Sequence, residues 1–556
     1  MRYTVDSSAS TQVHITGKGR NGRIGSIRLF QNGRLCKDIY FKFPGYETIF
    51  FSWEPHRTYE LEIEDMEISL AYRFCPERVL EEGVEFMEFG QEAVCFNRRN
   101  LADAFHQRYR NQHHFSPYKG WMNDANGLCW FDGYYHLFYQ YNPNEQKWGN
   151  MHWGHAASRD LLHWTHLPIA AFPQIELNGC EGWRGGAFSG SAVVHQGMMQ
   201  LFYTRHFGKT DRSIQRQWQV TKESRDGITF SHEVCCIWNT PEGVTWHFRD
   251  PKVTRIGDHW LMVLGGTCHD RPSVFCYHSE DLKSWTYKGI LYQERNPKYG
   301  IAECPDFFPL DGKYVLIAGY INADPTDAVR DTCYYIGDYA DGAFVPEAQG
   351  ILDYGKDFYG VQTFCRGKRR ICLGWNWCGA DVHVEEEGGV NGSLSLPRQL
   401  SICQGRLIGR VIPEIECLMT ESAENEPYYL ALEAEKGEAA GELELLLADG
   451  PKESLVLTVC RNKACLRLEE KAQEGNKGFT CAFALLEEPS ELEIYMDRAI
   501  VELYINHGVQ VCTKRFYMDQ AVLSPKLLKG EFRIKEHKGM ESIWESSGKG
   551  GRDDAP

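Results

Sequence analysis

The sequence predicts an all-β protein: a five-bladed β-propeller followed by a C-terminal β-sandwich, with an extra small N-terminal β domain. Short glycine-led strands recur at a similar spacing through the middle of the chain, and apolar and polar residues alternate near both ends. We expect an N-terminal β-sandwich-like module over 1–105, the propeller over 106–408, the C-terminal sandwich over 409–544 and a disordered tail over 545–556.

The central repeat consists of a glycine followed by an apolar-rich strand, and successive glycines lie 55 to 64 residues apart. A second element, SRDLLHW (158–164), returns as SEDLKSW (279–285). A unit of this length is typical of a four-stranded propeller blade, although a β-sandwich with accidental similarity is an alternative. The glycine-led segments are FDGYYHLFYQ (131–140), HQGMMQLFYT (195–204), IGDHWLMVLG (256–265), LDGKYVLIAG (310–319) and RGKRRICLGW (366–375).

The N-terminal module alternates apolar and polar residues in SIRLFQNGRL (26–35) and DIYFKFPGYETIFFSW (38–53), as half-buried strands do. Its aromatic side chains have two interpretations. They could form a platform for a sugar, but we favour core positions or packing against the propeller or another subunit, because large aromatics are usually buried. The residues concerned are Tyr40, Phe43, Tyr46, Phe50 and Trp53.

The overall composition excludes several classes of partner. The chain has 556 residues and a net charge of −16, which disfavours nucleic acid because phosphate backbones bind basic patches. No apolar run is long enough to span a membrane. The N-terminus MRYTVDSSAS lacks the apolar core of a secretory signal, and the 20 cysteines lack the spacing of a disulfide framework. We therefore expect reduced thiols and a cytoplasmic protein.

Asp124 lies in WMNDANGL (121–128), where the Asn-Gly pair alone is typical of a turn between strands. It also precedes the repeat glycine Gly133 by nine residues. Similar distances separate other polar residues from their repeat glycines. Because the first strands of propeller blades line the central axis, we expect these residues to converge at one mouth of the channel. They are Ser189, Asp250, Glu303 and Asp357, of which Asp357 could equally support its blade through a hydrogen bond.

Carboxylates gathered in this way suit the cleavage of a glycosidic bond, which needs a nucleophile or base and an acid. Asp124 has Asn123 as a hydrogen-bonding neighbour, which would keep it ionised as a nucleophile. Asp250 follows Arg249, whose charge would lower its pKa and keep it anionic to hold sugar hydroxyls. Glu303 has a thiol and a proline as neighbours, a less polar setting that would raise its pKa and suit an acid/base.

Histidines raise the question of a metal. His152 and His155 in HWGH, with His113 and His114 nearby, could be ligands, but on a strand an i, i+3 pair points to opposite faces. We therefore interpret them as structural or solvent-facing. Glycine-rich nucleotide loops and the G-x-S-x-G elbow are absent, so neither a metal nor a cofactor is expected.

Several ordered motifs closely resemble glycoside hydrolase family 32, the invertases, inulinases and levanases. The resemblance covers roughly residues 110 to 540 and implies a five-bladed propeller plus a sandwich, a retaining mechanism and no metal. It also implies that Asp124 is the nucleophile, Glu303 the acid/base and Asp250 the transition-state stabiliser. The motifs are HHFSPYKGWMNDANGLCWFDGYYHLFYQYNPNEQKWGNMHWGHAASRDLLHW (113–164), FSGSAV (188–193), FRDPKV (248–253), ECPDFF (303–308), YGKDFYGVQTF (354–364), SLPRQL (395–400) and LEIYMDRAIVELYINHG near 493–509.

Carried over motif by motif, the resemblance also implies a pocket for the fructosyl group. Trp148, Trp375 and Phe188 could instead be core aromatics, since large rings are commonly buried for packing. The implied pocket residues are Asn123, Gln140, Trp148, Phe188, Ser189, Arg249 and Trp375.

One residue departs from the family pattern W-[ML]-N-D-P-N-G: Ala125 stands where the proline is expected. Proline would fix its own φ and favour extended geometry at the preceding Asp. Its loss should cost about 0.5–1 kcal/mol, mainly through the unfolded chain. It removes no reactive atom, so we expect activity to survive.

These observations favour a retaining β-fructofuranosidase that acts on sucrose or short fructo-oligosaccharides of the inulin or levan type. The alternatives are a fructosyltransferase with the same intermediate, a non-catalytic fructoside-binding pseudoenzyme and, lower in rank, an inverting propeller glycosidase for pentosans. A homo-oligomer would form through the N-terminal or C-terminal β domain. The acidic segment VHVEEEGGVNG (382–392) should be solvated, or could border subsites beyond fructose.

Overall fold

The computed structural model describes residues 1–105, 107–179, 182–324, 326, 330–376, 389–421, 426–435, 442–460, 462–470 and 478–544. Nearly all of its regular structure is strand, which confirms the all-β prediction. The α-helices in this part of the chain, α1 (Val79–Glu82) and α2 (Glu176–Gly179), have four residues each, too few to cross a membrane. The expected tail and residues 382–388 of the acidic segment lie outside the described residues.

The N-terminal region forms two antiparallel sheets, with strand orders β1-β6-β3-β4 and β5-β2-β7-β8-β9. Val13, Ile27 and Leu61 are fully buried in the core of these sheets. Among the aromatic residues considered above, Trp53 is buried, whereas Phe50 is 55% exposed. The strands are β1 (Arg2–Asp6), β2 (Gln12–Gly19), β3 (Gly25–Gln31), β4 (Arg34–Phe41), β5 (Glu47–Ser52), β6 (Thr58–Glu64), β7 (Met66–Phe74), β8 (Glu85–Phe89) and β9 (Ala93–Phe96), with 3-10 turns at Arg20–Gly22 and Leu101–Ala104.

Five further sheets follow in sequence order, each built mainly from four consecutive strands. The first sheet also takes in β28 (Val390–Asn391), which pairs in parallel with β10. The strands are β10 (Gly120–Phe131), β11 (Tyr134–Asn142), β12 (His152–Ser158) and β13 (Trp164–Ala171); β14 (Trp183–His195), β15 (Met198–Lys209), β16 (Gln215–Ser224) and β17 (Val234–Ile237); β18 (Val244–Ile256), β19 (His259–Cys268), β20 (Arg271–Ser279) and β21 (Thr286–Gln293); β22 (Tyr299–Leu310), β23 (Lys313–Asn322), β24 (Arg330–Ala340) and β25 (Ala343–Ile351); and β26 (Phe358–Arg366), β27 (Arg369–Asn376), β29 (Arg398–Cys403) and β30 (Arg406–Val411).

The repeat glycines occupy the same place in every one of these sheets, the hairpin between the first and second strands. All five have positive φ angles between 59° and 82°, a conformation that glycine adopts without steric cost and that tight two-residue hairpin turns require. The sequence repeat therefore coincides with the sheet boundaries. The glycines are Gly133, Gly197, Gly257, Gly312 and Gly367.

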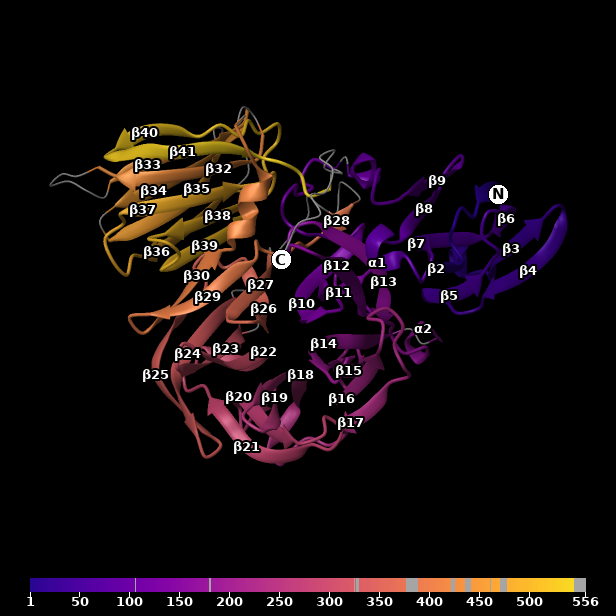
Figure 1. Cartoon of the computed structure of the whole chain (residues 1–556), viewed down its shortest axis with the longest axis horizontal. Coiled ribbons are helices and arrows are strands. Elements are labelled where there is room, and N and C mark those ends of the chain that lie inside the picture. Colours follow the sequence, from indigo (N-terminus) through magenta and orange to yellow (C-terminus); the bar gives the residue numbers. More distant parts are fainter. Residues whose placement is uncertain are drawn as a thin grey trace.

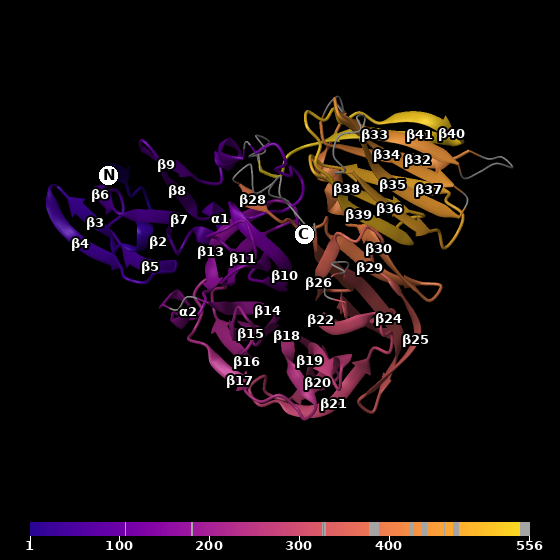
Figure 2. The same ribbon diagram turned by 180° about the vertical axis from the view of Figure 1, so that it is seen from behind.

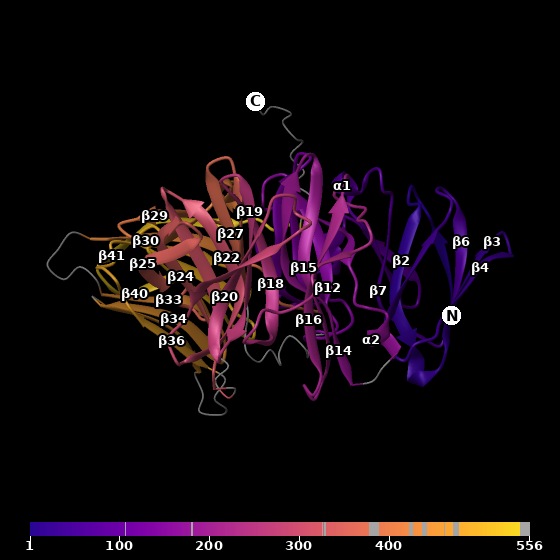
Figure 3. The same cartoon turned by 90° about the horizontal axis from the view of Figure 1, so that it is seen from below.

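The first strands of the five sheets form a closed ring. Each of β10, β14, β18 and β22 contacts the next, and β26 contacts β10 again. Figures 1 and 2 show the five sheets arranged around this ring, as in a β-propeller. Figure 3 shows the N-terminal and C-terminal sheets at opposite ends of the long axis.

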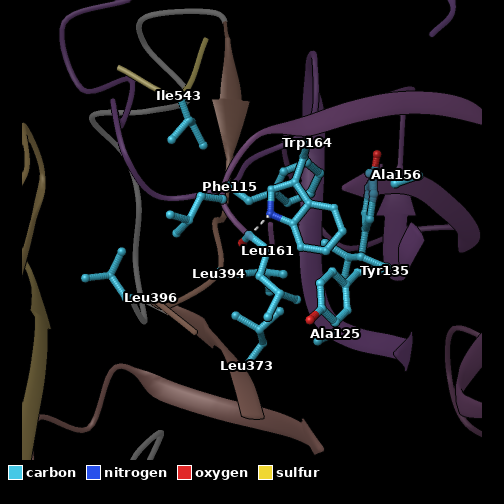
Figure 4. Packing of buried hydrophobic residues seen from close by; sticks show 14 of the residues in the cluster. Phe115, Ala125, Tyr135, Ala156, Leu161, Trp164, Leu373, Leu394, Leu396 and Ile543 are labelled. Atoms are coloured by element: carbon cyan, nitrogen blue, oxygen red, sulfur yellow. Dashed lines mark hydrogen bonds between the residues drawn. The ribbon is translucent and has the colours of Figure 1, made fainter. Parts of the chain in front are cut away.

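A large buried cluster packs against one face of the first sheet and includes residues of the fifth sheet, among them Leu373 (Figure 4). Trp164 packs there and donates its indole N–H to the carbonyl of Leu161 at 3.0 Å. The cluster includes Ala125 from β10, Phe86 from the N-terminal sheets and Trp544 from the end of the described chain. The N-terminal sheets thus share a core with the first sheet of the ring.

The C-terminal region forms two packed sheets, with strand orders β31-β41-β32-β37-β38-β39 and β36-β35-β34-β33-β40. Leu430, Leu445 and Leu457 are fully buried in the core of these sheets, as in a β-sandwich. The elements are a 3-10 helix (Pro413–Leu418), β31 (Met419–Thr420), β32 (Tyr428–Ala434), β33 (Leu443–Asp449), β34 (Glu453–Cys460), β35 (Lys463–Glu470), β36 (Phe479–Ala484), β37 (Glu491–Met496), β38 (Ile500–Ile505), β39 (Gln510–Arg515), β40 (Lys526–Gly530) and β41 (Phe532–Met540).

A buried set of charged residues joins the ring of sheets to this sandwich. One ring nitrogen of His114 lies 2.9 Å from a carboxylate oxygen of Asp497, and the other lies 3.1 Å from one of Glu502. Arg398 on β29 donates to Glu502 at 2.8 Å and to Asp353 at 2.9 Å. These side chains are at most 1% exposed, so each charge is compensated by opposite charges instead of water.

The ionised forms are the stable ones within this set. Burial lowers the pKa of His114, but its hydrogen bonds to Asp497 and Glu502 outweigh burial and raise the pKa to about 9. Burial raises the pKa of Glu502, yet Arg398 and His114 bring it down to about 2. Possible ligand atoms of His113, His114 and Asp497 lie within 4.8 Å of one another. Because both nitrogens of His114 face carboxylates, the arrangement suits an imidazolium.

The other histidines considered above are held by protein groups. The ring of His155 lies 3.0 Å from that of His136, and His152 contacts the carbonyl of Asn150 at 3.1 Å. Burial lowers the pKa of His152 to about 3, so its ring is neutral. The cysteines of the described residues are free thiols.

We expect the Arg398→Met substitution to lower the free energy of unfolding by about 3–5 kcal/mol, because it leaves the buried Asp353 without its cation and Glu502 with His114 alone. Urea denaturation at neutral pH measures this change. Arg406→Met is the matched control, since Arg406 forms a partly exposed ion pair with Glu487 at 3.0 Å and should cost less than about 1 kcal/mol. Equal effects of the two substitutions would contradict a stabilising role for the buried set.

Candidate active site

The first strand of each of the five sheets is interrupted by a β-bulge at an equivalent place. In each case two residues of the first strand lie opposite a break in the pairing with the second strand. Such bulges bend the strand and redirect side chains. In this protein, the bulges face the axis of the ring. The breaks lie between Met122 and Ala125, Ala187 and Gly190, Arg249 and Lys252, Glu303 and Asp306, and Tyr359 and Gln362.

The three candidate carboxylates occupy neighbouring places in these bulges. Asp124 is the second bulged residue of β10, and Asp250 the first of β18, with a φ of 64°. Glu303 immediately precedes the bulge of β22. The expectation of equivalent positions is therefore corrected to positions that differ by one or two residues. Counting from the glycine could not detect this offset, because strand length before the turn varies between sheets.

Asp357 is not among the axis residues. It immediately precedes β26, and its carboxylate accepts a hydrogen bond from the backbone N–H of Arg515 at 2.9 Å and an ion pair from Lys514 at 2.8 Å. Both partners belong to the C-terminal sandwich. Asp357 thus supports its sheet through a hydrogen bond, the alternative role considered for it above. Gly360 occupies the bulge in that sheet.

Asp124 is enclosed by polar neighbours. The Ser189 hydroxyl donates to its carboxylate at 2.6 Å, and the Cys304 thiol lies 3.4 Å away. Burial raises its pKa, while hydrogen bonds from Ser189 and Asn123 oppose that shift. On the opposite side, an added Cβ at Gly360 would lie 2.3 Å from Oδ1 of Asp124, so the carboxylate occupies the space that glycine leaves.

Arg249 pairs with a different carboxylate from the one expected. It donates to Glu303 at 2.7 Å through Nη2 and at 3.2 Å through Nε, whereas its closest approach to Asp250 is 3.9 Å. Adjacent residues of a strand point in different directions, so the neighbour in sequence is not the main partner in space.

The pKa pattern is consequently the reverse of the prediction. Burial raises the pKa of Asp250 to about 7 against the opposing effect of Arg249. Burial also raises the pKa of Glu303, but the charges of Arg249 and Arg330 lower it to about 2 overall. The hydroxyl of Tyr359 adds a hydrogen bond to Glu303 at 2.8 Å. Asp250 is therefore partly protonated near neutral pH, whereas Glu303 is ionised.

All ten residues singled out in the sequence line one cavity of about 850 Å³. Of the three aromatics with an alternative role, Trp148 is 37% exposed and Trp375 is buried against Trp121 at 5.6 Å between ring centroids. Phe188 stacks on His206 at 4.5 Å. The ten are Asn123, Asp124, Gln140, Trp148, Phe188, Ser189, Arg249, Asp250, Glu303 and Trp375.

Three further residues contact the carboxylates without having been expected from the sequence, and two of them, Arg330 and Tyr359, line the cavity. Tyr359 and Arg330 both act on Glu303, and Cys304 lies between Asp124 and Asp250, 3.4 and 3.7 Å from their carboxylates. Both Tyr359, which immediately precedes the bulge of β26, and Cys304, which lies in the bulge of β22, stand inside motifs quoted above, so an alignment of the repeats on their bulges would have found them. Arg330 opens β24 and carries no motif signal.

Comparison with family models gives a match over most of the chain. The model of the glycosyl hydrolases family 32 N-terminal domain matches residues 114–410, and that of the family 32 C-terminal domain matches residues 414–537. The chain belongs to glycosyl hydrolase family 32. It is therefore a glycoside hydrolase of the β-fructofuranosidase type by family, and the prediction of a β-propeller plus a β-sandwich agrees with the family's structures.

Individual family 32 relatives agree. A sucrose-6-phosphate hydrolase of Zymomonas mobilis subsp. mobilis is 32% identical over 459 residues, covering 74% of this chain and 88% of the relative. A raffinose invertase of Escherichia coli is 34% identical over 433 residues, covering 73% and 88%. A family 32 structure from Bifidobacterium adolescentis matches with a TM-score of 0.87 and 24% identity over 98% of this chain and 100% of that one, so the shared fold includes the N-terminal sheets.

We expect the catalytic efficiency, kcat/KM, to fall as the pH rises above about 7, because the carboxyl cluster loses its remaining proton near the pKa of Asp250. A general acid in this cluster works only below that pH. Hydrolysis of a β-fructoside measured from pH 4 to 9 tests this limb. Tyr359→Phe should move it to higher pH, since the variant removes a hydrogen bond that favours the ionised cluster. An unchanged kcat/KM up to pH 9 would show that hydrolysis does not depend on the proton that the carboxyl cluster loses near pH 7.

Proposed function

We propose that this chain is a retaining β-fructofuranosidase that hydrolyses terminal β-D-fructofuranosyl residues of sucrose or short fructo-oligosaccharides. The observation that carries the proposal is the convergence of Asp124, Asp250 and Glu303, from three different sheets, on one cavity. Two carboxyl groups flanking the bond are sufficient for glycoside hydrolysis, and the third can hold the sugar. The relatives named above as hydrolase and invertase support this reading.

The proposed roles follow from the surroundings of each acid. Asp124, next to the Ser189 hydroxyl, attacks the anomeric carbon and forms a covalent fructosyl-enzyme. Glu303 donates a proton to the departing oxygen, then accepts one from the water that releases fructose. Asp250 accepts hydrogen bonds from fructosyl hydroxyls and stabilises positive charge on the ring.

Glu303 must gain a proton before it can act as the acid. Arg249 holds it ionised, whereas Asp250 is partly protonated near neutral pH. We expect a bound fructosyl group to compete for the donors of Arg249, which weakens its pair with Glu303 and raises the pKa of that carboxyl. Asn123, Gln140, Trp148, Phe188 and Trp375 then enclose the sugar. Burial of the site excludes water around the charges.

We further propose a division of the chain into an N-terminal domain, a five-bladed propeller and a C-terminal sandwich. The five sheets over 120–411, whose first strands form a closed ring, are taken as five propeller blades. Residues 1–105 are taken as a separate N-terminal β-sandwich-like domain, and 409–544 as the C-terminal sandwich. The shared cluster of the N-terminal sheets with the first blade indicates a fixed position for that domain.

A phosphorylated sucrose is a second candidate substrate. Arg184, Lys209 and Arg212 line one wall of the cavity, and within the described part of the chain they form no ion pair with a protein acid. Three cations on one wall of the cavity, in a chain with a net charge of −16, suit an anionic leaving group. The Zymomonas mobilis relative is named a sucrose-6-phosphate hydrolase.

Asp124→Asn should lower kcat by several orders of magnitude while leaving Tm nearly unchanged, because it removes the nucleophile and keeps the shape of the side chain. Fructose release from sucrose and 1-kestose, followed by chromatography, measures the loss. Longer oligosaccharides formed by the wild type would indicate fructosyl transfer. An Asp124→Asn variant with normal turnover would exclude the nucleophile role, and a wild type without activity would favour a binding protein.

If the basic wall holds a phosphoryl group, kcat/KM for sucrose 6-phosphate should exceed that for sucrose by at least about tenfold, the effect of one charge-assisted hydrogen bond. Arg212→Gln and Lys209→Gln should remove most of this preference and leave sucrose hydrolysis unchanged. Arg216→Gln is the matched control, since Arg216 stacks on Trp238 outside the cavity, with its guanidinium 4.2 Å from the ring centroid. Equal kcat/KM for the two sugars would reject this candidate and leave neutral fructosides.

A further inference from the structure

A second cavity, of about 420 Å³, lies between the N-terminal sheets and the first sheets of the ring. Its N-terminal side is formed by Gly45–Thr48 and Phe50, and its other side by the segment that follows β11 and by residues around α2. Its size falls within the range of small-molecule sites, roughly 300–1,000 Å³. We refer to it as the interdomain cleft.

The interdomain cleft adjoins the active-site cavity. Trp148 and Arg184 line both. Trp148 also meets Phe188, on the active-site side, with ring centroids 5.7 Å apart. A ligand that extends out of the active site past Trp148 would therefore enter the cleft directly.

Contacts across the base of the cleft fix its two walls relative to each other. The backbone N–H of Gly45 donates to the carbonyl of Asn178 in α2 at 2.9 Å. An added Cβ at Gly45 would lie 2.9 Å from the same oxygen, so the walls approach as closely as glycine allows. Ser69 on β7 donates to the side-chain oxygen of Asn144 at 2.7 Å. The cleft is thus a preformed cavity.

The lining of the cleft suits a neutral sugar chain. Aromatic rings stand partly open to it, including Phe50, 55% exposed, and Trp148, 37% exposed. Phe50 is held edge-on against Phe172 at 5.1 Å, and the ring of Tyr46 is covered by Lys18 at 4.3 Å. Rings of this kind present flat apolar faces that can pack against the C–H faces of sugars.

The polar groups of the cleft point to the same class of ligand. They are mostly amides, which can donate hydrogen bonds to hydroxyl groups and accept them, and carboxylates, which accept them. Arg184, at the shared boundary, is the arginine among the residues that line the cleft, and no lysine lines it. A strongly anionic ligand would find few counter-charges here. The polar lining includes Glu47, Asn142, Asn144, Glu145, Asn150 and Asn178.

We propose that the interdomain cleft is a distal subsite that binds the sugar units of a fructo-oligosaccharide beyond the bond that is cleaved. The inference rests on the proposed β-fructofuranosidase function and extends it: the N-terminal domain contributes to the selection of substrate length. Sucrose ends before the cleft, whereas a tri- or tetrasaccharide reaches past Trp148 to Tyr46 and Phe50.

The test compares kcat/KM for sucrose, 1-kestose and nystose in the full-length protein and in the variants Tyr46→Ala, Phe50→Ala and their combination. We expect the combined variant to lose about five- to tenfold in kcat/KM for nystose, the effect of losing aromatic contacts, with sucrose hydrolysis unchanged. Tyr40→Ala is the matched control, because Tyr40 is an aromatic of the same domain, 49% exposed, that does not line the cleft.

The outcomes separate this inference from the function on which it rests. An unchanged ratio of nystose to sucrose efficiency in the combined variant would overturn the distal subsite and leave the hydrolase intact. If the wild type cleaves no β-fructoside, the proposed function fails. Calorimetric titration of nystose then decides on the cleft: weaker binding by the combined variant than by Tyr40→Ala supports it, and equal binding overturns it.

Discussion

Closure of the ring of first strands is the constraint on which the active site depends, because each of its three carboxylates comes from a different sheet. No single sheet places two of them in the cavity. The ring closes where β26 meets β10, and β28 pairs in parallel with β10 at the same seam. The sandwich supports this seam: Asp497 and Glu502 hold His114, before the first sheet, while Glu502 also holds Arg398 in the last. The positions of the three carboxylates therefore depend on the packing of the sandwich against the ring.

Gathering three carboxylates in a buried cavity is unfavourable, and the site offsets that cost by sharing charge and protons. Arg249 neutralises Glu303 directly, and the Ser189 hydroxyl and the Cys304 backbone N–H solvate Asp124 and Asp250. Burial, with smaller contributions from the charges of Glu303 and Asp124, raises the pKa of Asp250 to about 7. Asp250 is therefore partly protonated at neutral pH, next to the groups that need a proton. The bulges make this possible, since regular strands would turn alternate side chains away from the axis.

The sequence predicted the parts of this protein that depend on local pattern. The repeat glycines mark real hairpins because a two-residue turn needs positive φ, and that requirement is visible in a single residue such as Gly133. The cavity residues were identified mainly through motif resemblance. The predicted directions of the pKa shifts of Asp250 and Glu303 were wrong, because both depend on the direction of the Arg249 side chain. The pleat and the bulge of β18 determine that direction. The partner of Asp357, in the sandwich 158 residues away, has no local signal.

The family departure at position 125 can be weighed against these interactions. Ala125 is fully buried, pairs with Tyr139 on β11 and belongs to the large buried cluster at the first sheet (Figure 4). Loss of the proline acts mainly on the unfolded chain, at about 0.5–1 kcal/mol. The position of Asp124 is determined in the folded state, by the Ser189 hydroxyl on one side and the surface of Gly360 on the other. Neither contact involves residue 125. The geometry of the carboxylate is therefore maintained by the ring across three sheets, and a local change in backbone preference has little influence on it.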